Sequence, residues 1–142
     1  MLAEANEAEI ASARLALQKA SRASTKAFAR QMIADHTTML KKGRSLATAL
    51  NLQPQPPTPD SLEQHAQQET NQLNGAASGR AFDKAYLDAQ VQDHQTVLSL
   101  LQQFQGQAQH PELKTLITGA EPTVQKHLEQ ARHLDQQLAT QS

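Results

Sequence analysis

The chain has 142 residues, a formal net charge of -1, 3% aromatic residues and neither Cys nor Trp. This length suits a single domain with a real core, and the abundance of Ala, Leu and Gln favours helix over sheet. The absence of Cys excludes disulfides and thiolate chemistry, and mixed charges without a basic patch argue against nucleic-acid binding. No run of about 18 apolar residues occurs, so we expect no membrane span.

The first part of the chain predicts two long amphipathic helices joined by a short polar turn. In the first, at residues 4–21, apolar residues recur every three or four positions. The second, at residues 25–50, has an apolar stripe with a spacing close to that of a bundle seam. We expect Ser24 or Thr25 to cap this helix, and the short turn to make the two helices antiparallel neighbours.

A long connection separates this helix pair from the rest of the chain. Residues 53–59 contain four prolines, which end the second helix and impose an extended path. A short polar helix at residues 61–73 follows, and residues 74–79 form a flexible joint. Residues 53–78 therefore predict a partly helical crossover.

The remaining sequence predicts two more long helices, at residues 80–106 and 111–138. Pro111 suits the first position of a helix, whereas Pro122 lies inside the last helix and should kink it. Four long helices with two short turns and one long connection predict an all-α fold, a four-helix bundle formed by a single domain of residues 1–142.

Two of these helices share a sequence pattern. Phe28 is followed eight positions later by His36, and Tyr86 is followed eight positions later by His94, with an aspartate before each histidine. The match fits either duplicated helices or chance in Ala-rich helical sequence. At the start of the third long helix we expect Phe82 in the core and the Tyr86 hydroxyl bonded to a polar partner.

Four inward-facing polar residues lie at matched heights along the predicted helices. Glu9 and His36 each lie about 13 residues, or about 20 Å, from the first turn. His94 and His127 lie about 15 and 17 residues, or about 23–25 Å, from the second turn. Each long helix therefore brings one residue to a layer near the middle of the bundle.

Three imidazoles and a carboxylate suit zinc or another borderline divalent ion. The candidate metal ligands are Glu9, His36, His94 and His127. Asp35 and Asp93 are candidates to orient a histidine of a neighbouring helix. The alternative is a buried polar layer that bonds internally or to water and sets helix register without a ligand. The sequence indicates no other cofactor.

Patterns typical of catalysis are missing from the sequence. Di-iron bundles need Glu-x-x-His pairs, whereas Gln90 and Val91 stand where a carboxylate would be required before His94. Nucleophile motifs, phosphate-binding loops and Cys-His arrangements are also absent. Three further histidines have polar neighbours and are expected at the surface: His65, His110 and His133. We therefore expect no enzymatic activity.

A combination of residues spread over nearly the whole chain resembles a bacterial family. These residues are Glu9, the run Phe28 to His36, Gly79, Phe82 to Tyr86, Gln90-Val91, His94, Pro122 and His127-Leu128. Together they resemble the domain-of-unknown-function family numbered 4142. The resemblance implies a ferritin-like helical bundle, often labelled a putative outer-membrane protein. It also implies a periplasmic or envelope location after removal of a signal peptide, which is not visible here.

Three hypotheses of function follow, because the family resemblance supplies no activity. The first is a non-enzymatic envelope protein whose polar layer is only structural. The second is a bundle that binds a divalent, zinc-like metal, so that zinc raises the melting temperature near pH 7 but not near pH 5. The third is an interaction module in which residues 53–78 contact a second copy or another envelope protein.

Overall fold

The computed structural model describes residues 2–51 and 61–140. It consists of α1 (Leu2–Lys19), α2 (Ala23–Ala49), α3 (Ser61–Gly75), α4 (Arg80–Gln107) and α5 (Pro111–Thr140). The described residues contain no strand, which confirms the all-α prediction. The four long helices end within about two residues of their predicted limits, and α5 passes through Pro122 without a break. Among the helices described, none is long and apolar enough to cross a membrane.

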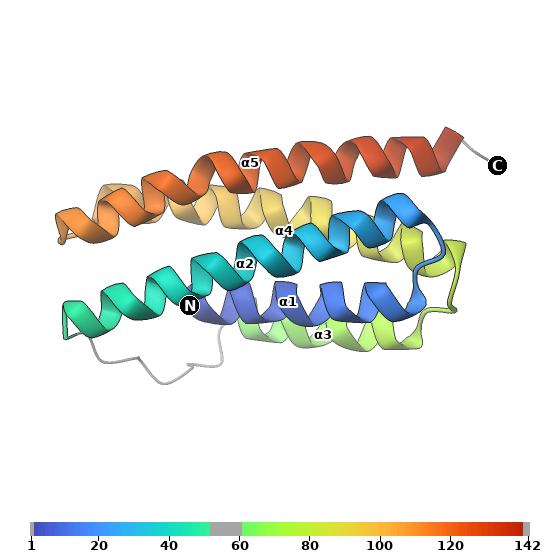
Figure 1. The fold of residues 1–142 in the computed structure, drawn as a ribbon, viewed down its shortest axis with the longest axis horizontal. Coiled ribbons are helices and arrows are strands. Elements are labelled where there is room, and N and C mark those ends of the chain that lie inside the picture. Colours follow the sequence, from blue (N-terminus) through green and yellow to red (C-terminus); the bar gives the residue numbers. More distant parts are fainter. Residues whose placement is uncertain (1, 52–60, 141–142) are drawn as a thin grey trace.

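The helices lie side by side with their axes roughly aligned (Figure 1). α1 packs against α2 and α4 packs against α5, as two antiparallel pairs. The pairs meet through α2 with α5 and through α1 with α4. The shorter α3 lies along α1 and α4, so the helical part of the predicted crossover is a packed member of the fold. Its Pro-rich part, residues 53–59, lies outside the described residues.

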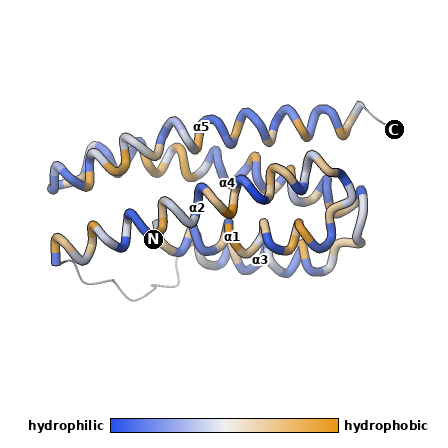
Figure 2. Tube along the Cα trace, in the orientation of Figure 1, coloured by the Kyte–Doolittle hydropathy of each residue, from blue (hydrophilic) through white to orange (hydrophobic). Residues whose placement is uncertain are grey.

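Two apolar clusters fill the interior, and the amphipathic helices contribute apolar residues to both (Figure 2). The larger includes Phe28, Met32, Phe82 and Tyr86, and it lies toward the turn between α1 and α2. The smaller is centred on residues of α4 and α5 near their shared turn: Leu101, Ile117 and Val124. Along α4 and α5, His94 and His127 fall between residues of the two clusters.

The aromatic residues at the start of α4 follow the prediction only in part. Phe82 is fully buried, as expected. Tyr86 packs between Phe82 and Phe28, with ring centroids 6.0 Å and 6.2 Å apart. The Tyr86 hydroxyl is buried without a hydrogen-bond partner, so the expected polar partner is wrong. The rings on either side hold the tyrosine in the apolar core, where packing decides its position.

The start of α2 also differs from the prediction. Its N-cap residue is Arg22, which makes no side-chain capping bond, so capping by Ser24 or Thr25 is wrong. Instead, the Asp83 carboxylate of α4 accepts hydrogen bonds from the backbone N–H groups of Ser21, at 2.8 Å, and Arg22, at 3.0 Å. A buried carboxylate of α4 thus satisfies two backbone donors in the turn that leads into α2.

Candidate metal centre

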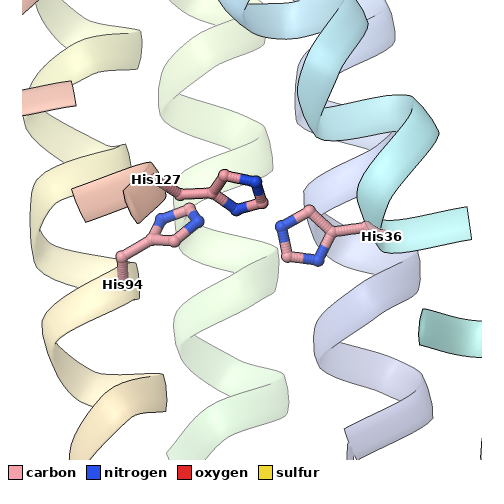
Figure 3. Close-up of side chains that lie close together, drawn as sticks. All are labelled: His36, His94 and His127. Carbon is pink, nitrogen blue, oxygen red and sulfur yellow. The ribbon is translucent and has the colours of Figure 1, made fainter. Parts of the chain in front are cut away.

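Three of the four residues predicted to form the middle layer meet inside the protein. His36 of α2, His94 of α4 and His127 of α5 are buried, and their ring centroids lie 5.3 to 5.7 Å apart. One ring nitrogen of each histidine lies within 4.8 Å of a ring nitrogen of both others. Figure 3 shows the three rings turned toward a common space. We call these residues the three-histidine cluster.

Each of these rings has one bonded nitrogen and one unbonded nitrogen. The bonded pairs are His36 Nδ1 with Asn6 Oδ1 at 2.8 Å, His94 Nδ1 with the Gln90 carbonyl at 2.8 Å, and His127 Nε2 with Asp35 Oδ2 at 2.7 Å. Every partner is an oxygen that accepts, so in a neutral ring the bonded nitrogen carries the proton. The lone pair then lies on the other nitrogen.

These other nitrogens are His36 Nε2, His94 Nε2 and His127 Nδ1. All three are buried and have no hydrogen-bond partner in the structure. A buried polar atom without a partner costs free energy, so three such atoms in one place call for an explanation. A ligand that accepts three lone pairs would supply it.

The surroundings keep the three rings neutral. Burial lowers the pKa of His36 to about 3, and repulsion from charged forms of His94 and His127 adds to this effect. Burial likewise lowers the pKa of His94 to about 4. Burial lowers the pKa of His127 as well, although its bond to Asp35 opposes the shift. At neutral pH all three imidazoles can therefore donate lone pairs, as metal binding requires.

The two aspartates considered as orienting residues have different partners. Asp35 of α2 bonds His127 of α5, and so does contact a histidine of a neighbouring helix. Asp93 of α4 instead lies 3.1 Å from His65 Nε2 of α3. The second aspartate therefore belongs to a different group of side chains.

Glu9 borders both groups of side chains. It is buried on α1 and borders a small cavity together with His65, Glu69 and Asp93. It also lines a larger cavity together with His36, although it is not part of the group of converging ring nitrogens. The matched heights agree with the meeting of the three histidines, but the direction of each side chain depends on which helices lie next to it.

Sequence reasoning missed the contribution of α3 to this second group. His65 and Glu69 are four residues apart, so they share one face of α3, and each offers a ligand atom within 4.8 Å of Asp93. That spacing was a readable signal, but the polar surroundings of His65 argued for an ordinary surface residue. Its contact with Asp93 depends on how α3 packs against α4.

A cavity of about 730 Å³ is bordered by His36, one member of the three-histidine cluster, and by residues of the smaller apolar cluster. His36 lies at its inner wall, whereas Arg44, whose side chain is 60% exposed, lies toward solvent. Apolar residues of α2, α4 and α5 form most of the lining, and Met39 is among them. The cavity therefore links the outside of the protein with the buried His36.

Comparison with solved structures finds the same fold in CopM. The Cu(I)-bound form of CopM matches with a TM-score of 0.80 and 20% sequence identity, over 96% of this chain and 91% of that chain. The Ag-bound form matches with a TM-score of 0.76, 20% identity and the same coverage. The apo form matches with a TM-score of 0.75 and 20% identity, over 96% and 92% of the two chains.

Among curated proteins, no sequence relative matches the chain. A family model does match, over residues 1–134, and its description is "Domain of unknown function (DUF4142)". The match spans all five helices except the last residues of α5. The chain therefore belongs to this family, as the resemblance of its residues implied.

Proposed function

We propose that this protein binds one copper ion, as Cu(I), between His36, His94 and His127. The observation that carries the proposal is the set of three buried ring nitrogens that lack partners, on rings that face a common space. Neutral imidazole is a common ligand of copper and zinc. A bound ion would give each of these nitrogens the partner that burial otherwise denies it.

The charge around the cluster favours a monovalent ion. None of the three ligands is a carboxylate, and the one carboxylate bonded to a ligand is Asp35, behind His127. The cost of burying an ion rises steeply with its charge, so one carboxylate can balance Cu(I) but leaves Zn²⁺ with a buried excess charge. The zinc site expected from the sequence included Glu9, which lines the cavity of His36 but does not belong to the group of converging ring nitrogens.

The solved structures support copper as the ion to test. CopM shares this fold and has been solved in Cu(I)-, Cu(II)- and Ag-bound forms. At about 20% identity the likeness concerns the fold, so the ligands proposed here rest on the histidines of this chain. The Met39 thioether along the cavity is a further group of the soft type that suits Cu(I).

The proposed role is to hold or buffer the ion, without catalysis. The large cavity offers a route by which an ion can reach His36 and leave again. We also propose that the protein works in the cell envelope, which rests on the family resemblance. Fractionation of cells that express the full-length gene tests the location, and recovery in the cytosolic fraction would contradict it.

Competition with a chromogenic Cu(I) chelator, under reducing conditions without oxygen, tests the binding proposal. We expect one equivalent of Cu(I) per chain in the unmodified protein. His94→Ala should abolish this binding, whereas His133→Ala, which changes an exposed residue of α5, should leave it intact. Ag(I), which does not change oxidation state here, should raise the melting temperature of the unmodified protein but not of His94→Ala.

Two results would overturn the copper proposal. If the folded, unmodified protein bound neither Cu(I) nor Ag(I), or if both histidine variants bound equally, a structural polar layer would be the better account. If zinc bound instead, and both Glu9→Gln and His94→Ala abolished it, the four-residue zinc site expected from the sequence would be restored.

A further inference from the structure

A second group of metal-ligating side chains lies beside the three-histidine cluster, on the side of α3. It consists of Glu9 from α1, His65 and Glu69 from α3, and Asp93 from α4, and we call it the carboxylate cluster. All four line one cavity of about 40 Å³. A single ion or water needs roughly 10–15 Å³ by this measure, so the space can hold one.

The geometry of the carboxylate cluster is already that of a convergent site. His65 Nε2 lies 3.1 Å from Asp93 Oδ1. One ligand atom from each of His65, Glu69 and Asp93 lies within 4.8 Å of the other two. The side chains come from three helices, so their convergence results from tertiary packing rather than from local sequence.

Glu9 adds an independent observation that points to a missing ligand. It is only 5% exposed, and its Oε2 atom is buried without a hydrogen-bond partner. This carboxylate borders the same cavity as His65, Glu69 and Asp93. A buried carboxylate oxygen without a partner is costly, and a cation in the cavity would provide the partner.

The acidic side chains of the carboxylate cluster have no Lys or Arg beside them among the described residues that line the cavity. Burial, reinforced by Asp93, raises the pKa of Glu69 to about 10, and burial followed by the charge of Asp93 also raises the pKa of Glu9. The cavity is lined by three carboxylates with His65 as the only described side chain that could carry a positive charge, and a cation inside it would balance them.

We propose that the carboxylate cluster binds one divalent transition-metal ion, of which Mn²⁺ is the representative, through Glu9, His65, Glu69 and Asp93. Three carboxylates and one imidazole form a harder and more anionic ligand set than three imidazoles, so the site prefers a divalent ion over Cu(I). The imidazole also distinguishes it from the all-oxygen sites typical of calcium and magnesium. This inference shares no ligand with the proposed copper site and stands without it.

Such an ion would tie α3 to the rest of the protein. Its ligands lie on α1, α3 and α4, and α3 otherwise contributes one fully buried apolar side chain among its described residues, Leu73 near its end. Mn²⁺ should therefore slow backbone hydrogen exchange in residues 64–75. This readout reports on α3 and is independent of copper binding.

Titration of the metal-free full chain with Mn²⁺, followed by the electron paramagnetic resonance signal of the free ion, tests the proposal. We expect one equivalent of Mn²⁺ to bind to the unmodified protein and equally to His36→Ala. Glu69→Gln and Asp93→Asn should each weaken binding by at least about tenfold, because even an outer partner of a metal ion is worth that much. The control is Glu129→Gln, which changes an exposed carboxylate of α5 bonded only to Gln125 and should have no effect.

Three results would overturn the proposal. The first is no Mn²⁺ binding by the folded, unmodified protein. The second is equal weakening by Glu129→Gln, which would indicate diffuse binding to surface charge. The third is loss of binding in His36→Ala, which would place Mn²⁺ at the three-histidine cluster. Circular dichroism of each variant tests whether it is folded. Cu(I) titration of the same proteins shows whether a variant loses Mn²⁺ binding, Cu(I) binding or both.

Discussion

The three-histidine cluster and the carboxylate cluster meet at consecutive residues of α4, His94 and Asp93, yet they differ in almost every physical property. The first is buried and offers nitrogen atoms from neutral rings. The second extends from the exposed His65 to the buried Glu9 and offers mainly carboxylate oxygens. Consecutive residues of a helix point about 100° apart, so one step along α4 leads from the interior to the seam with α3.

Burial therefore acts on the two clusters with opposite signs. In the three-histidine cluster it opposes protonation, so acid should destabilise the fold. In the carboxylate cluster it opposes loss of the proton, so a rise in pH should destabilise the fold. The same low-dielectric interior thus prepares one site for a soft ion of low charge and the other for a harder, divalent ion.

The largest expected effect comes from the apolar core that supports both clusters. Phe82 is fully buried and stacks on Tyr86, on the helix that carries both Asp93 and His94. Phe82→Ala should lower the free energy of unfolding by about 3–5 kcal/mol, as measured by denaturant titration. A loss below about 1 kcal/mol would show that this ring is not a core residue.

The next effect is the acid sensitivity of the three-histidine cluster without metal. An unfolded histidine has a pKa of 6.5, whereas that of folded His36 is about 3 and that of His94 about 4. Between these pH values the unfolded chain binds more protons than the folded chain. The stability that the neutral histidines contribute is therefore present above pH 6.5 and is lost as the pH falls. Each of these two histidines should therefore lower the free energy of unfolding by about 2 kcal/mol as the pH falls from 6.5 to 5.

Denaturant titrations at pH 6.5 and pH 5 measure this loss. His36→Gln should reduce it, because one of the two depressed pKa values is removed. His133→Gln changes an exposed histidine and should leave the loss as it is. An unchanged pH dependence in His36→Gln would contradict a buried, neutral His36.

A matched pair of aspartate variants separates the two clusters. Asp35→Asn should weaken Cu(I) binding by about 10- to 100-fold, because it alters the group that orients His127. Asp93 also precedes a histidine, His94, but its carboxylate contacts His65. Asp93→Asn should therefore weaken Mn²⁺ binding instead of Cu(I) binding. Chelator competition and Mn²⁺ titration of both variants measure the contrast. Equal effects of the two variants on Cu(I) would show that the clusters are not separate.

The smallest expected effect is a gain in stability. The pKa of Glu69 is raised in the folded state, so folding becomes less favourable as the pH rises above the ordinary value of 4.5. Near pH 7 folding therefore has to protonate Glu69, which costs free energy. Glu69→Gln is neutral in both states, removes this cost and should stabilise the metal-free protein by about 1 kcal/mol. Melting in the presence of a chelator measures the gain, and Glu129→Gln should show none. A melting temperature below that of the unmodified protein would contradict crowding at Glu69.

Local sequence determined the helices and the position of each functional residue along them. The spacing of apolar residues and the turn residues near Pro111 are local properties, so they predicted the long helices to within about two residues. The same spacing predicted that His36, His94 and His127 share a level. The sequence pattern shared by α2 and α4 also has a structural counterpart. Its two aromatic residues, Phe28 and Tyr86, contact each other, and so do its two histidines, His36 and His94.

Tertiary structure decided which of these residues meet. Glu9 borders the cavity of His36 as well as that of His65, and the packing of α3 against α1 and α4 brings His65 and Glu69 to Asp93. Likewise, Asp83 reaches the backbone before α2 only because the fold brings the start of α4 to the turn between α1 and α2. Side-chain direction around a helix and the identity of the neighbouring helix depend on how the whole core packs, and no local spacing contains that information.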